Sequence, residues 1–239
     1  MLKSEFVSNF RIVENELLIL FLLALIGSIF VPFTFLWVPM IGIAYVAVMC
    51  ALLYQGLDKL LNKSVFDTSS KYFGGFHKKT HILVLSKIIV GTIVLLEIYL
   101  LPIGVILWAV SFHAIDWPNI IQIISEFCSR EYEINYIIIV EIINVVIGSM
   151  LINTLFLFIN SITAGNWRIK QTQRIPKIVT ALGFIICILL YILCITWRII
   201  LKMKYSLLSC VLHLVLNLLM LFILIVFVKK SIHRVYENV

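Results

Sequence analysis

The chain has 239 residues, of which 62% are hydrophobic and only 13% are charged. A soluble domain is about 25% charged, so this composition excludes an ordinary soluble protein and leaves no room for a separate catalytic or nucleotide-binding domain. The net charge of +7 comes from bases spread over short segments between apolar runs, so we expect them to orient the chain in a membrane and predict no nucleic-acid partner.

The apolar runs predict an all-α, polytopic membrane protein. About 20 apolar residues cross a bilayer core as a helix, and the chain has runs for about six such helices. We expect residues 1–239 to form a single membrane domain with spans at about 17–35, 38–56, 86–110, 136–162, 178–197 and 206–228.

The first two spans are expected to form a hairpin. Residues 17–57 contain no charged side chain. This run is too long for one membrane span and long enough for two. Pro32 and Pro39 lie near the middle of this run, and proline interrupts a helix because it lacks the N–H and its ring clashes with the preceding turn. We therefore expect the helix to break over residues 33–38.

A segment that mixes aromatic and basic residues precedes the third span, from Lys63 to His81. Its phenylalanines fall at spacings of seven and three, which places them on one face of a helix with lysines beside them. Such a segment either lies on the anionic inner leaflet or is held by a cytoplasmic partner. The side chains that we expect to contact a partner are Phe66, Tyr72, Phe73, Phe76, Lys78 and Lys79.

Two acidic residues fall inside the third and fourth spans. Glu97 lies near the middle of one, and Glu141 lies one to two turns inside the other. A charge at bilayer depth costs about 2.5 to 3.5 kcal/mol, so each should face the bundle interior, be protonated or find a partner such as Asn144. Two interpretations stay open: these groups line a transport pathway, or they tie helices together.

The last span carries a narrow polar stripe. His213 and Asn217 are four residues apart, and Ser209 and Cys210 lie one turn earlier, so these residues share one side of a leucine-rich helix. The stripe should face other helices. A proton relay between an acidic residue and His213 is one hypothesis, and hydrogen bonding between helices is the other.

The basic residues predict the orientation. An even number of spans places both ends on one side of the membrane, and that side would hold fifteen of the bases against four on the other. Because bases are retained on the cytoplasmic side, both termini are predicted to be cytoplasmic.

Sequence signatures of enzymes are missing. The chain has no H-E-x-x-H, no G-x-S-x-G and no phosphate-binding glycine loop. Its five cysteines have no ligand spacing. We therefore predict a protein without catalytic activity, cofactor or metal site.

The first hundred residues resemble the YesL family of bacterial membrane proteins. The resemblance rests on the break at Pro32-Phe-Thr34 and Pro39-Met-Ile-Gly-Ile-Ala-Tyr45, followed by Phe-x-x-Phe-x-Lys-Lys from Phe73 to Lys79. It covers mainly residues 16–100. It implies a small polytopic protein of the bacterial inner membrane that is associated with carbohydrate ABC transporters.

The chain is also similar in size and span count to permease subunits of ABC-2 type exporters, including those that remove antimicrobial peptides. Ser86-Lys87 at the start of the third span resembles a pair often found there. This similarity implies a permease subunit that works with a separate cytoplasmic ATPase.

Our leading hypothesis is a noncatalytic subunit or accessory protein of a bacterial transport complex, with membrane lipid and other transporter subunits as partners. The alternative is an exporter permease with an ATPase partner. A third possibility is a proton-coupled carrier that acts alone, which predicts pH-dependent flux without ATP.

Overall fold

The structure is a computed structural model that describes residues 2–37, 39–63, 80–111, 134–169 and 206–237, with Asp116, Pro118, Asn119, Gln122 and Ile185. Nearly all of these residues are helical and none of them lies in a strand, which confirms the all-α class for this part of the chain. The elements are α1 (Leu2–Trp37), α2 (Pro39–Asp58), η1 (Lys59–Lys63), α4 (Thr80–Leu96), η4 (Glu97–Tyr99), α5 (Leu100–Ser111), α7 (Ile134–Ile169) and α9 (Leu207–Glu237).

Within the described ranges, five helical stretches are long and apolar enough to cross a membrane. They are Phe6–Phe30, Ile43–Leu61, Ile82–Leu107, Ile134–Ile162 and Leu207–Ile232. In chain order they correspond to the first four predicted spans and the last one. The span predicted at 178–197 lies outside the described residues, apart from Ile185.

The prediction that the helix breaks over residues 33–38 is wrong for residues 33–37. Helix α1 passes through Pro32 and remains helical to Trp37. A single proline removes one hydrogen bond, and membrane helices tolerate this because neighbouring groups satisfy the freed carbonyl. Pro39 is instead the first residue of α2, where its missing N–H is not needed by the helix.

Helices α1 and α2 form an antiparallel hairpin, as the uncharged run predicts. Lys59 of η1 forms an ion pair with Glu16 of α1, and farther along the hairpin the Tyr45 hydroxyl donates to the Leu23 carbonyl. Gly27 permits this close approach, because a Cβ built there would overlap the Tyr45 side chain.

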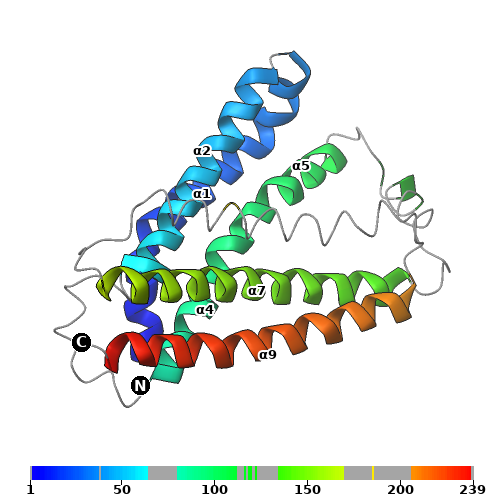
Figure 1. Ribbon diagram of the computed structural model, residues 1–239. Helices are drawn as coiled ribbons and strands as arrows, with labels where there is room; N and C mark the ends of the chain where they lie inside the picture. The colour runs from blue at the N-terminus through cyan, green and yellow to red at the C-terminus, as the bar shows by residue number, and fades with distance from the viewer. Residues whose placement is uncertain are drawn as a thin grey trace.

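The other contacts fix the directions of the remaining helices. The unit α4–η4–α5 runs in the same direction as α1, because Asn9 bonds Ser86 near its start and Ser28 lies against Gly104 near its end. Helices α7 and α9 also run in the same direction and lie side by side over their length (Figure 1).

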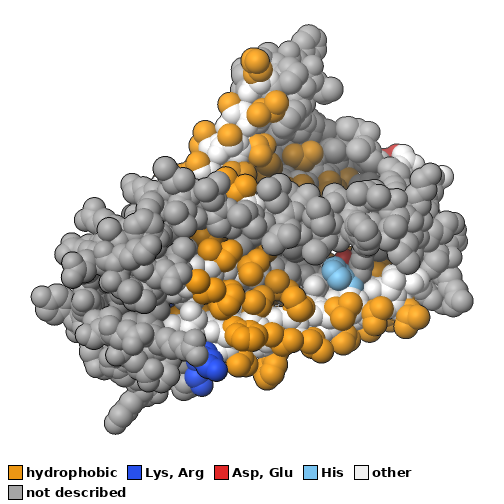
Figure 2. All heavy atoms as spheres, in the orientation of Figure 1, with side chains coloured by type: hydrophobic (Ala, Val, Ile, Leu, Met, Phe, Trp, Pro, Cys, Tyr) orange, Lys and Arg blue, Asp and Glu red, His pale blue; other side chains and the backbone are white. Residues whose placement is uncertain are grey.

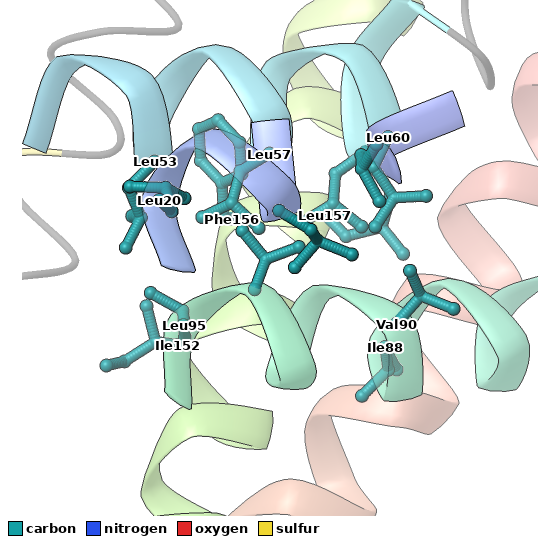
Figure 3. Packing of buried hydrophobic residues seen from close by; sticks show 14 of the residues in the cluster. Leu20, Leu53, Leu57, Leu60, Ile88, Val90, Leu95, Ile152, Phe156 and Leu157 are labelled. Carbon is teal, nitrogen blue, oxygen red and sulfur yellow. The ribbon is translucent and has the colours of Figure 1, made fainter. Parts of the chain in front are cut away.

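We call one end of the bundle the basal end; it holds the start of α1, η1, the start of α4 and the ends of α7 and α9 (Figure 1). Most of the hydrophobic core lies in this half, where α4 contacts α1, α2, α7 and α9 (Figure 3). Its most deeply buried side chains there include Val13, Leu57, Leu60, Leu61, Ile88, Phe156, Leu157, Val228 and Ile232.

We call the opposite end the distal end. There the hairpin of α1 and α2 lies with α5, while α7 and α9 form a separate pair (Figure 1). The second hydrophobic cluster, centred on Ile137 and Cys210, draws its described members only from α7 and α9. Figure 2 shows hydrophobic side chains along the visible face of this pair, as expected for a surface in contact with lipid.

Candidate functional site

The most unusual buried group of the described chain is the Lys87 side chain, which is only 2% exposed. Its ammonium donates to Asn9 Oδ1 at 3.0 Å and to the Leu60 carbonyl at 3.2 Å. The Asn9 amide in turn donates to Ser86 Oγ at 2.8 Å. We call this group of Asn9, Leu60, Ser86 and Lys87 the lysine junction. Lysine is almost never fully buried without partners, so the burial depends on these hydrogen bonds.

Local structure explains why the lysine junction forms at this place. Helix α2 ends in the π-helical turn η1, and Leu60 lies in that turn. The last carbonyls of a helix have no partner within the helix, and a lysine is a favourable donor at this negative end of the helix dipole. Lys87 thus caps α2 from another helix.

An ion pair lies close to the lysine junction. Glu16 is 5% exposed and pairs with Lys59, which directly precedes Leu60 in the sequence. Asp58, the residue before Lys59, is 7% exposed. Four charged residues, Glu16, Asp58, Lys59 and Lys87, therefore lie at adjoining positions of α1, α2, η1 and α4. A balanced set of this kind is less costly to bury than separate charges.

Glu97 lies where the third span changes from α-helix to a short 3₁₀ turn. The helix tightens into the 3₁₀ turn Glu97–Tyr99 ahead of Pro102, which cannot donate to the Ile98 carbonyl. Glu97 is half-buried, and its Oε2 has no hydrogen-bond partner among the described residues. Its side chain is therefore partly covered by the protein.

Asn144 joins α7 to α9 rather than to an acidic residue. Its Nδ2 donates to the Cys210 carbonyl at 3.3 Å, and its side chain is 4% exposed. Glu141, one turn earlier on α7, is half-buried. On α9, His213 and Asn217 are also half-buried, and Asn217 Nδ2 lies 3.4 Å from His213 Nε2.

The residues expected to contact a partner, at positions 66 to 79, lie outside the described residues. The structure does describe what borders them: η1 on one side and α4 on the other. Both borders contribute to the lysine junction. The junction therefore connects the two ends of the predicted docking segment to each other and to α1.

The sequence interpretation missed several interhelical contacts. It placed Lys87 at the start of the third span, whereas α4 begins at Thr80 and Lys87 is buried within it. It did not single out Asn9, nor Asn153, whose amide donates to Thr92 Oγ1 at 3.3 Å. A signal existed for Asn153, since polar residues in membrane spans face other helices, but sequence alone does not name their partners.

Among the described residues, no group of three or more histidine, cysteine or acidic side chains could hold a metal ion. The chain matches no family model, no curated protein and no solved structure. The site therefore has to be interpreted from its own chemistry. It offers buried hydrogen bonds and a fixed polar junction at the base of the bundle.

Proposed function

We propose that this protein is a noncatalytic, multi-pass membrane subunit of a bacterial transport complex, and that it binds another component through the segment between η1 and α4. The observation that carries the proposal is the lysine junction, which joins η1 and α4 to α1 on either side of this segment. Binding through a segment with fixed ends costs less conformational entropy than binding through one with free ends. The aromatic and basic residues Phe73, Phe76, Lys78 and Lys79 supply contacts suited to a protein partner.

We also propose six spans with both termini in the cytoplasm. Because α7 and α9 run in the same direction, a chain that crosses the membrane in both has to return between them. This supports the predicted span at 178–197. Single cysteines at Ser8 and Lys229 should react with a membrane-impermeant maleimide in inside-out vesicles and not in right-side-out vesicles. Reaction in right-side-out vesicles would reverse the orientation.

Copurification in mild detergent tests the docking proposal. The wild type should bring down a transporter component, with carbohydrate ABC transporters the first to examine. The variant Phe73→Ala, Lys78→Glu, Lys79→Glu should lose it. A matched control changes the same residue types on exposed parts of α9: Phe222→Ala, Lys229→Glu, Lys230→Glu. A wild type without a bound component, or equal recovery of both variants, would contradict the proposal.

A second candidate function is an exporter permease, and Glu97 is the observation that favours it. A carboxylate oxygen without a hydrogen-bond partner among the described residues, at a 3₁₀ turn near the middle of a span, is a group suited to face a pathway. Flux should be measured after reconstitution with the partner ATPase. If Glu97→Gln and His213→Ala both transport at the wild-type rate, neither group serves a pathway.

A further inference from the structure

Two glutamates border the interface that α4 and η4 form with α1 and α2. A Cβ built on Gly56 of α2 would lie 3.5 Å from Glu16 Cβ and 3.7 Å from Val94 Cγ1, so the stem of Glu16 and the side chain of Val94 approach the same point. Glu97 follows Val94 by three residues, which places it on the same face of this helical span. Because η4 also packs against α1, both glutamates belong to one interface.

The two glutamates lie at neighbouring levels of this interface. The hydrogen bond from Asn9 to Ser86 joins positions that are 77 apart, on two spans that run in the same direction. At this register Glu97 lies level with Leu20, four residues beyond Glu16. An α-helix rises about 1.5 Å per residue, so the two glutamates are about 6 Å apart along the interface.

The charges of the two carboxyl groups are compensated differently. Glu16 forms the ion pair with Lys59, while Glu97 forms none with any described residue. Each glutamate has a buried oxygen, Oε2, without a hydrogen-bond partner in the described ranges. A buried carboxylate without a compensating base is costly at membrane depth, so Glu97 is more stable with a proton bound.

Along α1, α2, η4 and α5, charged groups approach Glu97 from the basal side only. Residues 17–57 and 98–111 contain no charged side chain. On the basal side Glu16 and Lys59 are followed by Asp58 and Lys87. The other titratable side chains at this depth are Tyr45, Cys50 and Tyr54 of α2 and Tyr99 of η4, with Glu141, Cys210 and His213 in the distal pair of α7 and α9. Charged groups thus connect Glu97 to the basal end.

We propose that Glu97 binds a proton and exchanges it with the basal end through Glu16. On release, the Glu97 carboxyl group donates its proton through one water molecule to Glu16 Oε2, and Glu16 then donates it to water at the basal end. Glu97 is left as a carboxylate, and uptake follows the reverse order. Lys59 stays protonated throughout and holds Glu16 in position. The site involves no partner, so it goes beyond the proposed docking function and is independent of it.

Dicyclohexylcarbodiimide tests whether Glu97 binds a proton. This apolar reagent adds the O–H of a carboxylic acid across one of its C=N bonds and leaves carboxylates unchanged. The full chain in membrane vesicles is treated at pH 6, and mass spectrometry of its peptides gives the rate of adduct formation at each acid. Glu97 should react at least about ten times faster than Glu14, the control on the exposed face of α1, because exposed glutamates are ionised at this pH. Equal rates would overturn the proposal.

The side of exchange is tested by raising the pH on one side of the membrane. Inside-out and right-side-out vesicles are loaded at pH 6, their orientation is determined from the maleimide reaction at Ser8→Cys, and the bulk solution is brought to pH 9. The rate at Glu97 should fall about fivefold where the basal end faces the bulk solution and stay constant in the other vesicles. No fall in the first orientation, or a fall in the second, would contradict exchange with the basal end.

The route is tested at Glu16. In Glu16→Gln, and in Glu16→Gln with Lys59→Gln, which leaves no unpaired charge, the fall after the pH change should be about ten times slower than in the parent chain. Glu14→Gln, on the same helix, should respond as fast as the parent. An equally fast response in both Glu16 variants would exclude the route. A changed rate at constant pH 6 in both would show that Glu16 only supports the structure around Glu97, which would also overturn it.

Discussion

The basal and distal ends of this bundle are held together in different ways. At the basal end α1, α2, η1, α4, α7 and α9 share one hydrophobic core, together with the Glu16–Lys59 ion pair and the lysine junction. At the distal end the contacts divide between α1, α2 and α5 on one side and α7 with α9 on the other. Long-range connections are therefore concentrated at the base.

The difference shows where a membrane bundle gains its stability. Lipid tails are as apolar as leucine, so burying a leucine between helices adds little hydrophobic driving force, and close packing and polar contacts decide. Both occur at the basal end. The distal helices expose apolar side chains, such as Phe30 at 60% and Leu212 at 60%, which suit contact with lipid. Among the described residues, the basal end is thus the part in which the largest number of helices is joined.

The largest effect should come from a cavity in the basal core. Phe156 is fully buried among residues of several helices, so Phe156→Ala should lower the free energy of unfolding by about 2 to 4 kcal/mol through lost packing. Phe222, which is 70% exposed on α9, is the control, and Phe222→Ala should cost less than about 0.5 kcal/mol. Helical circular dichroism during titration with SDS in mixed micelles measures both. Equal losses would mean that the basal core has no special role.

A smaller loss is expected where α5 lies close to α1. A Cβ on Gly104 would lie 2.6 Å from Ser28 Cβ, which is fixed to the backbone of α1 and cannot rotate away. Gly104→Ala should therefore force α5 from α1 and cost about 1 to 3 kcal/mol in the same titration. At Gly56 a Cβ would meet its nearest neighbour at 3.5 Å, so Gly56→Ala should be almost neutral. A neutral Gly104→Ala would show that the distal contact is loose.

Hydropathy was sufficient to predict five spans because length and apolar composition are local properties. It placed helix ends less well. Helix α1 begins at Leu2 and has 36 residues, about 54 Å, which exceeds a bilayer core of about 30 Å. Charged residues such as Arg11 and Glu14 end an apolar run, but they do not end a helix on which they are exposed.

The lysine junction could not be predicted from local sequence. Lys87 and its acceptor Asn9 are separated by 78 positions, and a lysine close to the start of a span is usually a membrane-surface base. The polar stripe of α9 was predictable because its residues recur at helical spacing. The helix that contacts this stripe was not predictable. Asn144 of α7 donates to the backbone carbonyl of Cys210, and a side-chain pattern gives no information on backbone acceptors.

Removing one hydroxyl from the hairpin should have an intermediate effect. Tyr45→Phe deletes the hydrogen bond to the Leu23 carbonyl and leaves the ring against Gly27, so we expect a loss of about 1 kcal/mol. Helical circular dichroism of the wild type and of Tyr45→Phe, during titration with SDS in the same mixed micelles, measures this loss. Tyr136→Phe, at a side chain that is 63% exposed, is the matched control. A loss above about 3 kcal/mol would mean that Tyr45 stabilises more than this single bond.

The smallest effects compare polar contacts at two depths. Asn153 and Thr92 are both buried and meet in the middle part of the bundle. Ser161 is also buried, but its partner Ser231 is only half-buried, and this pair meets near the basal end. Double-mutant cycles to alanine should give a coupling of about 0.6 kcal/mol for the first pair, the average for hydrogen bonds between membrane helices. The second pair should give less, because water near the membrane surface can replace a lost hydroxyl partner. A larger coupling between Ser161 and Ser231 would contradict this expectation. It would mean that water is excluded from the basal end as fully as from the middle of the bundle, so that polar contacts at both depths stabilise the fold.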